Sequence, residues 1–584
     1  MKIRIQYIAI IAVFFVKTHN TTAQKKDENI GTEVVNVVKT YTPSVSDAFK
    51  VKETPILDDE ETTKKEAIQY TIFSFPVAST FSPNKGKASE IEKEPKQKLF
   101  QNFATLGFGN FATIDAALFA NTKLSTSESI GGMFRHLSSL NNVKGTNLAS
   151  NFSTTSIDAL YENQQKDLNY TLNIGFQKQM YNWYGLPSEY EIVNYPTDLS
   201  VINPKQKYLN FYLGGKIAVN EGIFNDMALN YNRFWDRFGS IENQFFIKPN
   251  FTLDVLDYKF RTNLIIDYVG GGFNKDYYET NLYSMKYSFV NLGLNPNYSL
   301  IKNDWTMNLG MSFFYSANNE ANKNNFYVYP KIVTTYKVVG DLMIFYAGLE
   351  GNLEQNSYRN FTNSNPFISP TIGITPTDIQ FDFYAGLKGK LANYISYNVK
   401  ASLLNERNKA LFKSNDYSFL NTNIDGYAFG NSYTIVYDNV KTVNLFCELK
   451  AEFSKDISFA INGSFSNYKT TNQEKAWNLP SVKFEAKLEA NITKNWYAGT
   501  NLFFIGARSD QQVNDLGSLT AVSDYSKTVP NYFDVNAHLG YKYNERFTAF
   551  FKANNIANQA YQKWLNYPVQ GFQILIGASY KFDF

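Results

Sequence analysis

The chain ends in an unbroken alternation of residue types over residues 572–584. One face would carry Phe572, Ile574, Ile576, Ala578, Tyr580, Phe582 and Phe584, and the other Gln573, Leu575, Gly577, Ser579, Lys581 and Asp583. A period of two residues is typical of a β-strand with two different faces. Thirteen residues are many for the closing strand of a soluble sheet, whereas a tilted strand crosses a bilayer in about 9–11 residues. The pattern predicts an all-β fold, a transmembrane antiparallel β-barrel.

The amino terminus predicts export from the cytoplasm. Lys2 and Arg4 precede an apolar run over residues 7–16, and small or polar residues follow it up to Ala23. A run of about ten apolar residues is too short to span a membrane as a helix, which takes about 20. Residues 1–23 are therefore predicted to be a signal peptide cut near Ala23, with no cysteine nearby to carry a lipid. The expected location is the outer membrane of a Gram-negative cell.

The composition of the remaining chain agrees with a barrel whose strands have one wet face. No second long apolar run occurs, and the mean hydropathy is −0.33. Every other residue of a barrel strand faces the lumen, so a low mean hydropathy is expected. The 49 Phe and 41 Tyr suit aromatic girdles at the two membrane interfaces. The net charge of +3 is too small to indicate a nucleic-acid partner.

Residues 24–100 differ from the rest and are predicted to be a partly disordered periplasmic lead segment. They are rich in charged residues and contain Pro43, Pro55, Pro76, Pro83 and Pro95. Two more apolar pieces, residues 33–38 and 68–79, could add as a strand to the sheet edge of a partner. The predicted partner-docking residues are Val34, Val35, Val37, Val38, Tyr41, Pro43 and Phe49.

Residues 101–584 are predicted to form the barrel. Alternating segments separated by polar turns repeat along them, and we expect about 22 strands, an even number. Short connections such as residues 454–456 and 543–546 would face the periplasm. The longer connections, expected to face outside the cell, are residues 184–205, 357–377, 406–430 and 511–529.

The connection at residues 406–430 is rich in aromatic residues, namely Tyr417, Phe419, Tyr427 and Phe429. Two interpretations fit this composition. The connection could fold over the mouth of the barrel as an aromatic lid, or it could be a solvated loop whose aromatic side chains pack on each other.

Ten charged residues are predicted to face the lumen because they alternate with apolar residues along their strands. They are Lys483, Glu485, Lys487, Glu489, Glu448, Lys450, Glu452, Lys388, Lys390 and Lys581. Neither lipid nor a dry core would accept such a ladder of charges. Both signs are present, which suggests little net ion preference, and the ladder could equally be a cross-strand structural network. The single cysteine, Cys447, falls on the apolar face of its segment, which predicts a lipid-facing side chain and excludes a disulfide scaffold.

The carboxy-terminal residues resemble those of a known family. Residues 554–561, with the sequence NNIANQAY, followed by YPVQGF at 567–572 and the terminal strand, resemble the carboxy-terminal signature of TonB-dependent receptors. The resemblance implies a 22-stranded outer-membrane barrel for transport. It also implies a barrel-insertion signal, formed by Tyr580, Phe582 and Phe584, that the barrel-assembly machinery reads.

The chain departs from this family at its amino terminus. Only about 75 residues lie between the predicted signal peptide and the first expected strand, and they lack the Gly-rich short strands of a plug domain. A complete plug is therefore not expected, although a barrel of this size has a lumen that needs an occupant. Residues 33–38 resemble the short segment with which the family contacts TonB.

The sequence offers no site for chemistry. His136 and His538 are the histidines outside the signal peptide, and neither has a partner at metal-ligand spacing. We also find no phosphate-binding glycine loop and no serine nucleophile elbow. The sequence thus predicts no catalytic residue, no metal, no cofactor and no enzymatic activity.

Two functions remain. The first is a barrel that passes or gates solutes, with its lumen occupied by inward-folded loops, by the lead segment or by a partner. The second is a non-conducting structural subunit of a multiprotein outer-membrane complex, docked through the lead segment. Outer-membrane lipid and a TonB-like or other protein are the expected partners.

Overall fold

The computed structural model describes residues 100–187, 198–255, 258–277, 284–417, 423–515 and 522–583. The predicted signal peptide and lead segment lie outside these ranges, apart from Phe100. The same holds for Phe584 and for the predicted docking residues Val34, Val35, Val37, Val38, Tyr41, Pro43 and Phe49. The strands and connections that follow therefore concern the predicted barrel.

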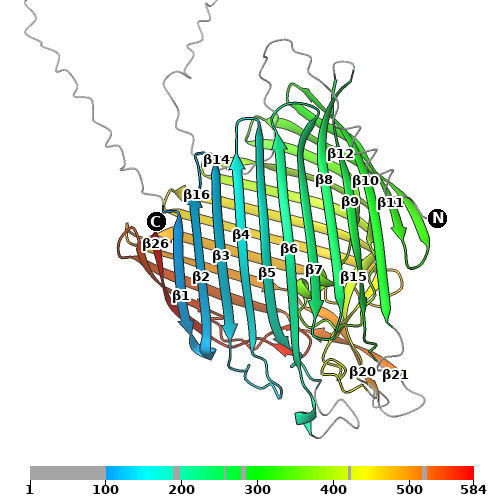
Figure 1. The fold of residues 1–584 in the computed structure, drawn as a ribbon, viewed down its shortest axis with the longest axis vertical. Coiled ribbons are helices and arrows are strands. Elements are labelled where there is room, and N and C mark those ends of the chain that lie inside the picture. The colour runs from blue at the N-terminus through cyan, green and yellow to red at the C-terminus, as the bar shows by residue number, and fades with distance from the viewer. Residues whose placement is uncertain are drawn as a thin grey trace, which may run out of the picture. The chain divides into compact units, whose positions relative to one another are not determined.

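Twenty-two strands form one closed sheet (Figure 1). Each strand pairs antiparallel with its neighbours in the chain, and β1 pairs with β26 over residues 102–109 and 575–582, which closes the barrel. The predicted fold class, an antiparallel barrel of about 22 strands, is confirmed. In the first half the strands are β1 (Asn102–Gly109), β2 (Thr113–Lys123), β3 (Glu128–Ser139), β4 (Phe152–Gln164), β5 (Leu168–Asn182), β6 (Lys205–Val219), β7 (Phe224–Asp236), β8 (Ile241–Val255), β9 (Tyr258–Phe273), β10 (Met285–Lys302) and β11 (Trp305–Asn318). In the second half they are β12 (Lys323–Val339), β13 (Met343–Glu354), β14 (Thr377–Ala392), β15 (Ile395–Ser414), β16 (Tyr433–Ser454), β17 (Ile457–Thr470), β18 (Val482–Asn491), β19 (Trp496–Ile505), β22 (Tyr532–Lys542), β23 (Phe547–Asn554) and β26 (Gln573–Phe582).

The alternation of residue types separates the two faces of the sheet. On β5, Leu172 and Ile174 are 49% and 46% exposed, while the intervening Asn173 points to the other face. Ile157 on β4 and Ile576 on β26 are similarly exposed. Apolar side chains that stay exposed on every part of a closed sheet match a lipid-facing band.

Cys447 lies on this exposed face of β16, next to Leu445 on the same side. Among the described residues, no helix is long and apolar enough to cross a bilayer.

The connections between strands are short at one end of the barrel, which we call the short-turn end, and longer at the other, the long-loop end. The predicted short connections lie at the short-turn end, where residues 455–456 join β16 to β17 and residues 543–546 join β22 to β23. The predicted long connections all lie at the other end. Which end faces the periplasm stays a prediction.

Two of the predicted long connections contain more strand than expected. β15 continues to Ser414 and β16 begins at Tyr433, so residues 406–414 belong to a strand. A bulge lies between Glu406 and Lys409, with Asn408 at a φ of 51°. It shifts the alternation of apolar and polar residues by one position, so the sequence pattern does not indicate a continuous strand there. Residues 511–529 fall mostly in a separate hairpin of β20 (Arg508–Asp515) and β21 (Val522–Val529).

Candidate functional site

A short helix lies within the barrel near its long-loop end. Helix α2 (Tyr358–Ser364) belongs to residues 355–376, which connect β13 to β14 and which we call the inner loop. Ser357 caps the helix, because its Oγ accepts a hydrogen bond from the backbone N–H of Asn360 at 3.1 Å. A helix of seven residues is unstable alone. Its position must therefore come from contacts with the barrel wall.

Glu242 of β8 binds the start of α2. This carboxylate is fully buried and accepts hydrogen bonds from the backbone N–H groups of Tyr358, at 2.6 Å, and Arg359, at 3.1 Å. It also accepts one from the hydroxyl of Tyr287 on β10, at 2.8 Å. The first N–H groups of a helix have no partner within it and carry partial positive charge, so a carboxylate is a favourable acceptor there. Glu242 therefore anchors the inner loop to the wall.

A second buried carboxylate holds the same residue of α2. The Tyr358 hydroxyl donates to Asp236 Oδ2 at 2.8 Å, while Asp236 Oδ1 accepts from the backbone N–H groups of Phe238 and Ser240 at 2.9 Å each. Burial, with the nearby Asp236, raises the pKa of Tyr358 well above its usual value. Tyr358 thus stays protonated and keeps its proton available for this bond.

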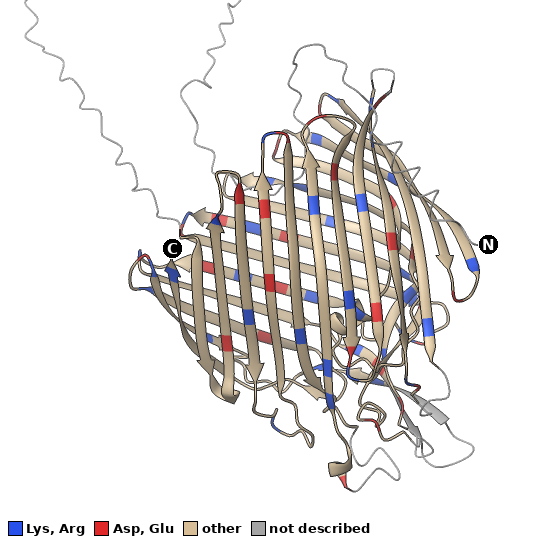
Figure 2. Cartoon of the chain, viewed as in Figure 1, with Lys and Arg blue, Asp and Glu red and all other residues tan. Residues whose placement is uncertain are grey.

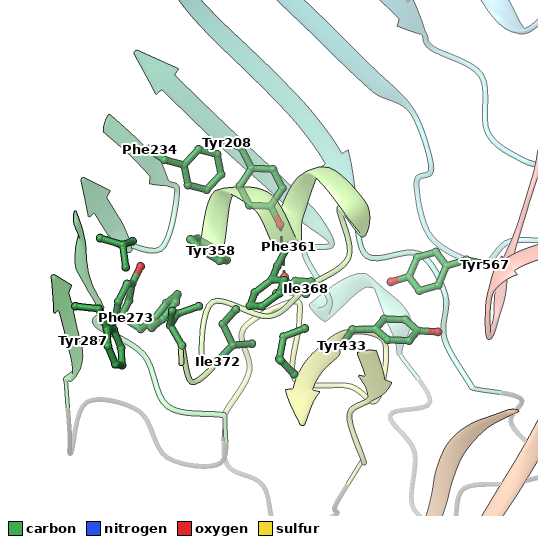
Figure 3. Close-up of a cluster of buried hydrophobic side chains, with 14 residues drawn as sticks. Tyr208, Phe234, Phe273, Tyr287, Tyr358, Phe361, Ile368, Ile372, Tyr433 and Tyr567 are labelled. Atoms are coloured by element: carbon green, nitrogen blue, oxygen red, sulfur yellow. Dashed lines mark hydrogen bonds between the residues drawn. The ribbon is translucent and has the colours of Figure 1, made fainter. Parts of the chain in front are cut away.

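Aromatic side chains from several strands enclose the inner loop (Figure 3). The Tyr358 ring lies 4.9 Å from the Phe273 ring of β9, and the Phe361 ring lies 5.9 Å from the Phe412 ring of β15. The inner loop thus contacts walls that are several strands apart. The buried members of this cluster, the aromatic core, are Tyr208, Phe234, Val269, Phe273, Tyr287, Phe289, Tyr358, Phe361, Ile368, Ile372, Ile374, Tyr433, Ile435 and Tyr567.

Other long connections pack onto the inner loop or onto each other. Tyr567, from the small hairpin of β24 (Gln562–Trp564) and β25 (Tyr567–Pro568), stacks on Phe367 at 3.7 Å and donates to the backbone oxygen of Asn431. Tyr427 is fully buried, and its ring centroid lies 5.6 Å from that of Trp183 in the β5–β6 connection. The connection after β15 therefore packs on other loops. Two of its aromatic residues, Tyr417 and Phe429, also stack on each other with their ring centroids 6.4 Å apart, whereas Phe419 lies outside the described residues.

A prediction concerns the contact between these connections. A Cβ atom at Gly426 would lie 1.8 Å from the backbone oxygen of Asn203. Since backbone cannot yield as a flexible side chain does, we expect Gly426→Ala to separate the β5–β6 and β15–β16 connections. Hydrogen exchange of residues 423–432 should rise by about tenfold or more, which corresponds to a loss of about 1.4 kcal/mol. Gly373→Ala, with no atom within 4 Å of its added Cβ, is the control and should leave exchange unchanged.

A polar cavity of about 770 Å³ lies beside α2 on the side toward the short-turn end. Asn210 and Tyr212 line it, and both follow Tyr208, which packs on α2, along the direction of β6 toward the short turns. The inner loop contributes Arg359 and Asn363. The remaining lining residues are Met133, Arg135, Ser156, Asp158, Asn173, Gln177, Leu213, Gly214, Asn230, Tyr231 and Asn232.

The ten charged residues that the sequence predicts to face the lumen all lie on strands. Figure 2 shows that charged residues of both signs occur along many strands of the barrel. On β18, Nζ of Lys487 lies 3.3 Å from Oε1 of Glu489. Oε2 of the same Glu489 lies 3.2 Å from Nε2 of His538. On β16, Nζ of Lys450 lies 3.0 Å from Oε2 of Glu448.

The other members of that set lie on different strands. Lys388 of β14 lies over the Tyr346 ring, Lys390 is on the same strand, Glu452 is on β16, Lys483 and Glu485 are on β18, and Lys581 is on β26. None of the ten lines the polar cavity. Their exposure to a pore stays a prediction, as does an insertion role for Tyr580 and Phe582, whose rings stack at 6.2 Å at the end of β26.

Sequence reasoning missed Glu242, Tyr358 and Arg359. Tyr358 follows Glu242 by 116 residues, and no local pattern links them. The one available signal was the carboxylate itself, at the second residue of β8 and followed by the polar residues Asn243 and Gln244. Among the described residues, no group of three or more His, Cys, Asp or Glu side chains could hold a metal ion.

Several solved structures of outer-membrane receptors and transporters have a similar fold. The described barrel matches FpvAI in its complex with pyocin S2 with a TM-score of 0.61 and 11% identity, over 84% of this chain and 71% of that one. It matches the ferripyoverdine receptor of the outer membrane of Pseudomonas aeruginosa with a TM-score of 0.60 and 12% identity, over 84% and 72%. It matches the ferric-catecholate import receptor Fiu of Escherichia coli K12 with a TM-score of 0.60 and 9% identity, over 84% and 82%.

No protein-family model and no curated protein matches the sequence. The structural matches are TonB-dependent receptors, so the resemblance predicted from the carboxy-terminal residues is confirmed for the barrel fold. At 9–12% identity the likeness is one of fold.

Proposed function

Starting from a barrel with the fold of outer-membrane receptors, we propose that this protein gates the passage of a solute across the outer membrane, with the inner loop as the gate. It acts without enzymatic chemistry and without a complete plug domain. Its exported form begins near Gln24, after removal of residues 1–23. The charged ladder that includes Lys483 and Glu485 lines the path of the solute.

The observation that carries this proposal is the way in which the inner loop is held. Glu242 accepts three hydrogen bonds, two of them from the start of α2, and the aromatic core encloses Tyr358 and Ile368 completely. A barrel of 22 strands has a lumen too wide for its own wall side chains to fill. A chain segment tied into that lumen at defined points is suited to close it and to release it.

Opening the gate requires energy from outside the barrel. The hydrogen bonds to Glu242 must break, and aromatic surface must be exposed to water, so the closed state is strongly preferred. A ligand or partner shifts this equilibrium only by binding the open state more tightly than the closed one. A solute at the long-loop end, or a TonB-like protein acting through residues 33–38, would supply that difference.

Planar-bilayer recording of the purified wild-type protein tests the proposal. A gate predicts a low baseline current interrupted by discrete openings of one size. A pore that is permanently open would contradict closure by the inner loop. A barrel that never opens, in the presence or absence of cell-envelope extract, would favour the second function.

That second function is a structural subunit of an outer-membrane complex, and the packing of several connections into one core favours it. Tyr567, Phe367 and Asn431 join three connections into a single body at the long-loop end. Docking would use the lead segment, through Val34, Val35, Val37, Val38, Tyr41, Pro43 and Phe49. Insertion by the barrel-assembly machinery through Tyr580, Phe582 and Phe584 applies to both functions.

Deleting residues 33–50 separates the two functions. If the lead segment docks a partner, the complex extracted in mild detergent should lose that partner while the barrel remains folded. Mass measurement of the tagged complex reports the change, and deletion of residues 80–92 within the same segment is the control. Unchanged partners together with faster uptake of a large antibiotic would instead make the lead segment part of the gate.

A further inference from the structure

We infer that the polar cavity beside α2 binds a small organic anion, one that carries a carboxylate or phosphate together with hydroxyl groups. The inference rests on the proposed function, because an anion bound there would join the gate to the barrel wall. Arg359 belongs to the inner loop, and Arg135 belongs to β3.

The guanidinium groups of the two arginines in the cavity make no direct contact with a carboxylate among the described residues, although Arg359 interacts electrostatically with the buried Glu242. Among the described residues, neither the guanidinium of Arg359 nor that of Arg135 makes a hydrogen bond or an ion pair, although the backbone N–H of Arg359 donates to Glu242. The carboxylate in the lining is Asp158, and it already accepts a hydrogen bond from the hydroxyl of Tyr212. The cavity therefore keeps two cations with unused donors, and guanidinium donors match carboxylate and phosphate oxygens in pairs.

The remaining lining suits the neutral part of such a ligand. Amide side chains dominate it, and each amide offers both a donor and an acceptor. Oδ1 of Asn210 is buried without a partner, and leaving such an acceptor unpaired is unfavourable. A ligand with hydroxyl groups could satisfy acceptors and donors of this kind. The amides that line the cavity are Asn173, Gln177, Asn210, Asn230, Asn232 and Asn363.

The size and position of the cavity limit the ligand further. A volume of about 770 Å³ is typical of sites for small molecules rather than for polymers. The cavity lies on the short-turn side of α2, so the closed gate separates it from the long-loop end. A bound anion would contact α2 through Arg359 and the wall through Arg135, and would thereby stabilise the closed gate.

Isothermal titration of the full chain in detergent tests this inference. The probes are glucuronate, glucose 6-phosphate and, as the neutral control, glucose. We expect at least one of the two anions to bind and glucose to bind at least about tenfold more weakly. Arg359→Gln and Arg135→Gln should each lower the affinity for the anion by about tenfold or more, since each removes a charge-assisted hydrogen bond.

Arg261→Gln is the matched control, because it removes one guanidinium group from a strand that does not line the cavity. It should bind the anion as the wild type does, and circular dichroism should report the same melting temperature for all three variants. The inference is overturned if neither anion binds, if glucose binds equally well, or if the arginine variants keep wild-type affinity. Gating currents that persist without anion binding would overturn this inference alone and leave the proposed function standing.

Discussion

Replacing residues 358–373 with a Gly-Ser linker of equal length is expected to raise the conductance of the barrel by about tenfold or more, because barrels wider than about 16 strands leave an aqueous channel when nothing fills them. The linker keeps β13 and β14 connected but removes α2 and four of the five inner-loop side chains in the aromatic core, leaving Ile374. Without those four side chains, most of the packing that holds the segment in the lumen is lost. Planar-bilayer recording measures the conductance directly.

The same replacement should make cells sensitive to large antibiotics. A vancomycin-sized solute is excluded by an intact outer membrane, and the emptied lumen would admit it. The control replaces residues 319–322, an exposed connection at the same end of the barrel, with Gly-Ser. An unchanged conductance in the inner-loop variant, or an equal rise in the control, would show that the inner loop does not close the barrel.

Glu242→Ala is expected to lower the free energy of opening of the inner loop by about 3–5 kcal/mol. This is the range measured when one partner of a buried charged interaction is removed. Three donors lose their acceptor at once, namely the N–H groups of Tyr358 and Arg359 and the hydroxyl of Tyr287. The donors of Tyr358 and Tyr287 make buried hydrogen bonds, so water does not replace the carboxylate easily there. Hydrogen exchange of residues 357–365 gives the free energy of opening, and bilayer recording should show more frequent openings.

Glu350→Ala provides the comparison for this variant. Glu350 of β13 accepts a hydrogen bond from the hydroxyl of Tyr384 at 2.8 Å. It makes no hydrogen bond to the inner loop among the described residues. Exchange in the inner loop should stay at the wild-type rate in this variant. If both variants loosen the inner loop equally, the effect comes from general destabilisation of the barrel, and Glu242 is not its anchor.

The barrel itself could be predicted from the sequence because its signal is local. On β5 the exposed Leu172 and Ile174 alternate with Asn173, and similar alternation recurs on strand after strand. Short polar turns between the segments then specify antiparallel neighbours. The prediction failed at residues 406–414, where the bulge near Asn408 shifts the alternation by one position. The strand is present there, but its apolar residues change face.

The candidate site could not be predicted in the same way. Tyr358 and Glu242 are 116 residues apart, and Tyr567 reaches Asn431 across 136 residues. No period within a strand relates such pairs. The sequence suggested inward-folded loops as one possible occupant of the lumen, and it left open whether the aromatic connection at residues 406–430 is a lid or a solvated loop. The structure places residues 355–376 within the barrel, with the other connections packed around them.

The sequence by itself determined the class of the fold, the number of strands and the carboxy-terminal resemblance to TonB-dependent receptors, because each depends on residues that are neighbours in the chain. Only the tertiary structure decided which connection enters the lumen, which carboxylate holds it and where unpaired guanidinium groups meet a cavity. Closing the sheet brings distant residues together, as Glu242 and Tyr358 illustrate. The wall positions that meet the inner loop are set by strand register and barrel curvature, which no single segment encodes.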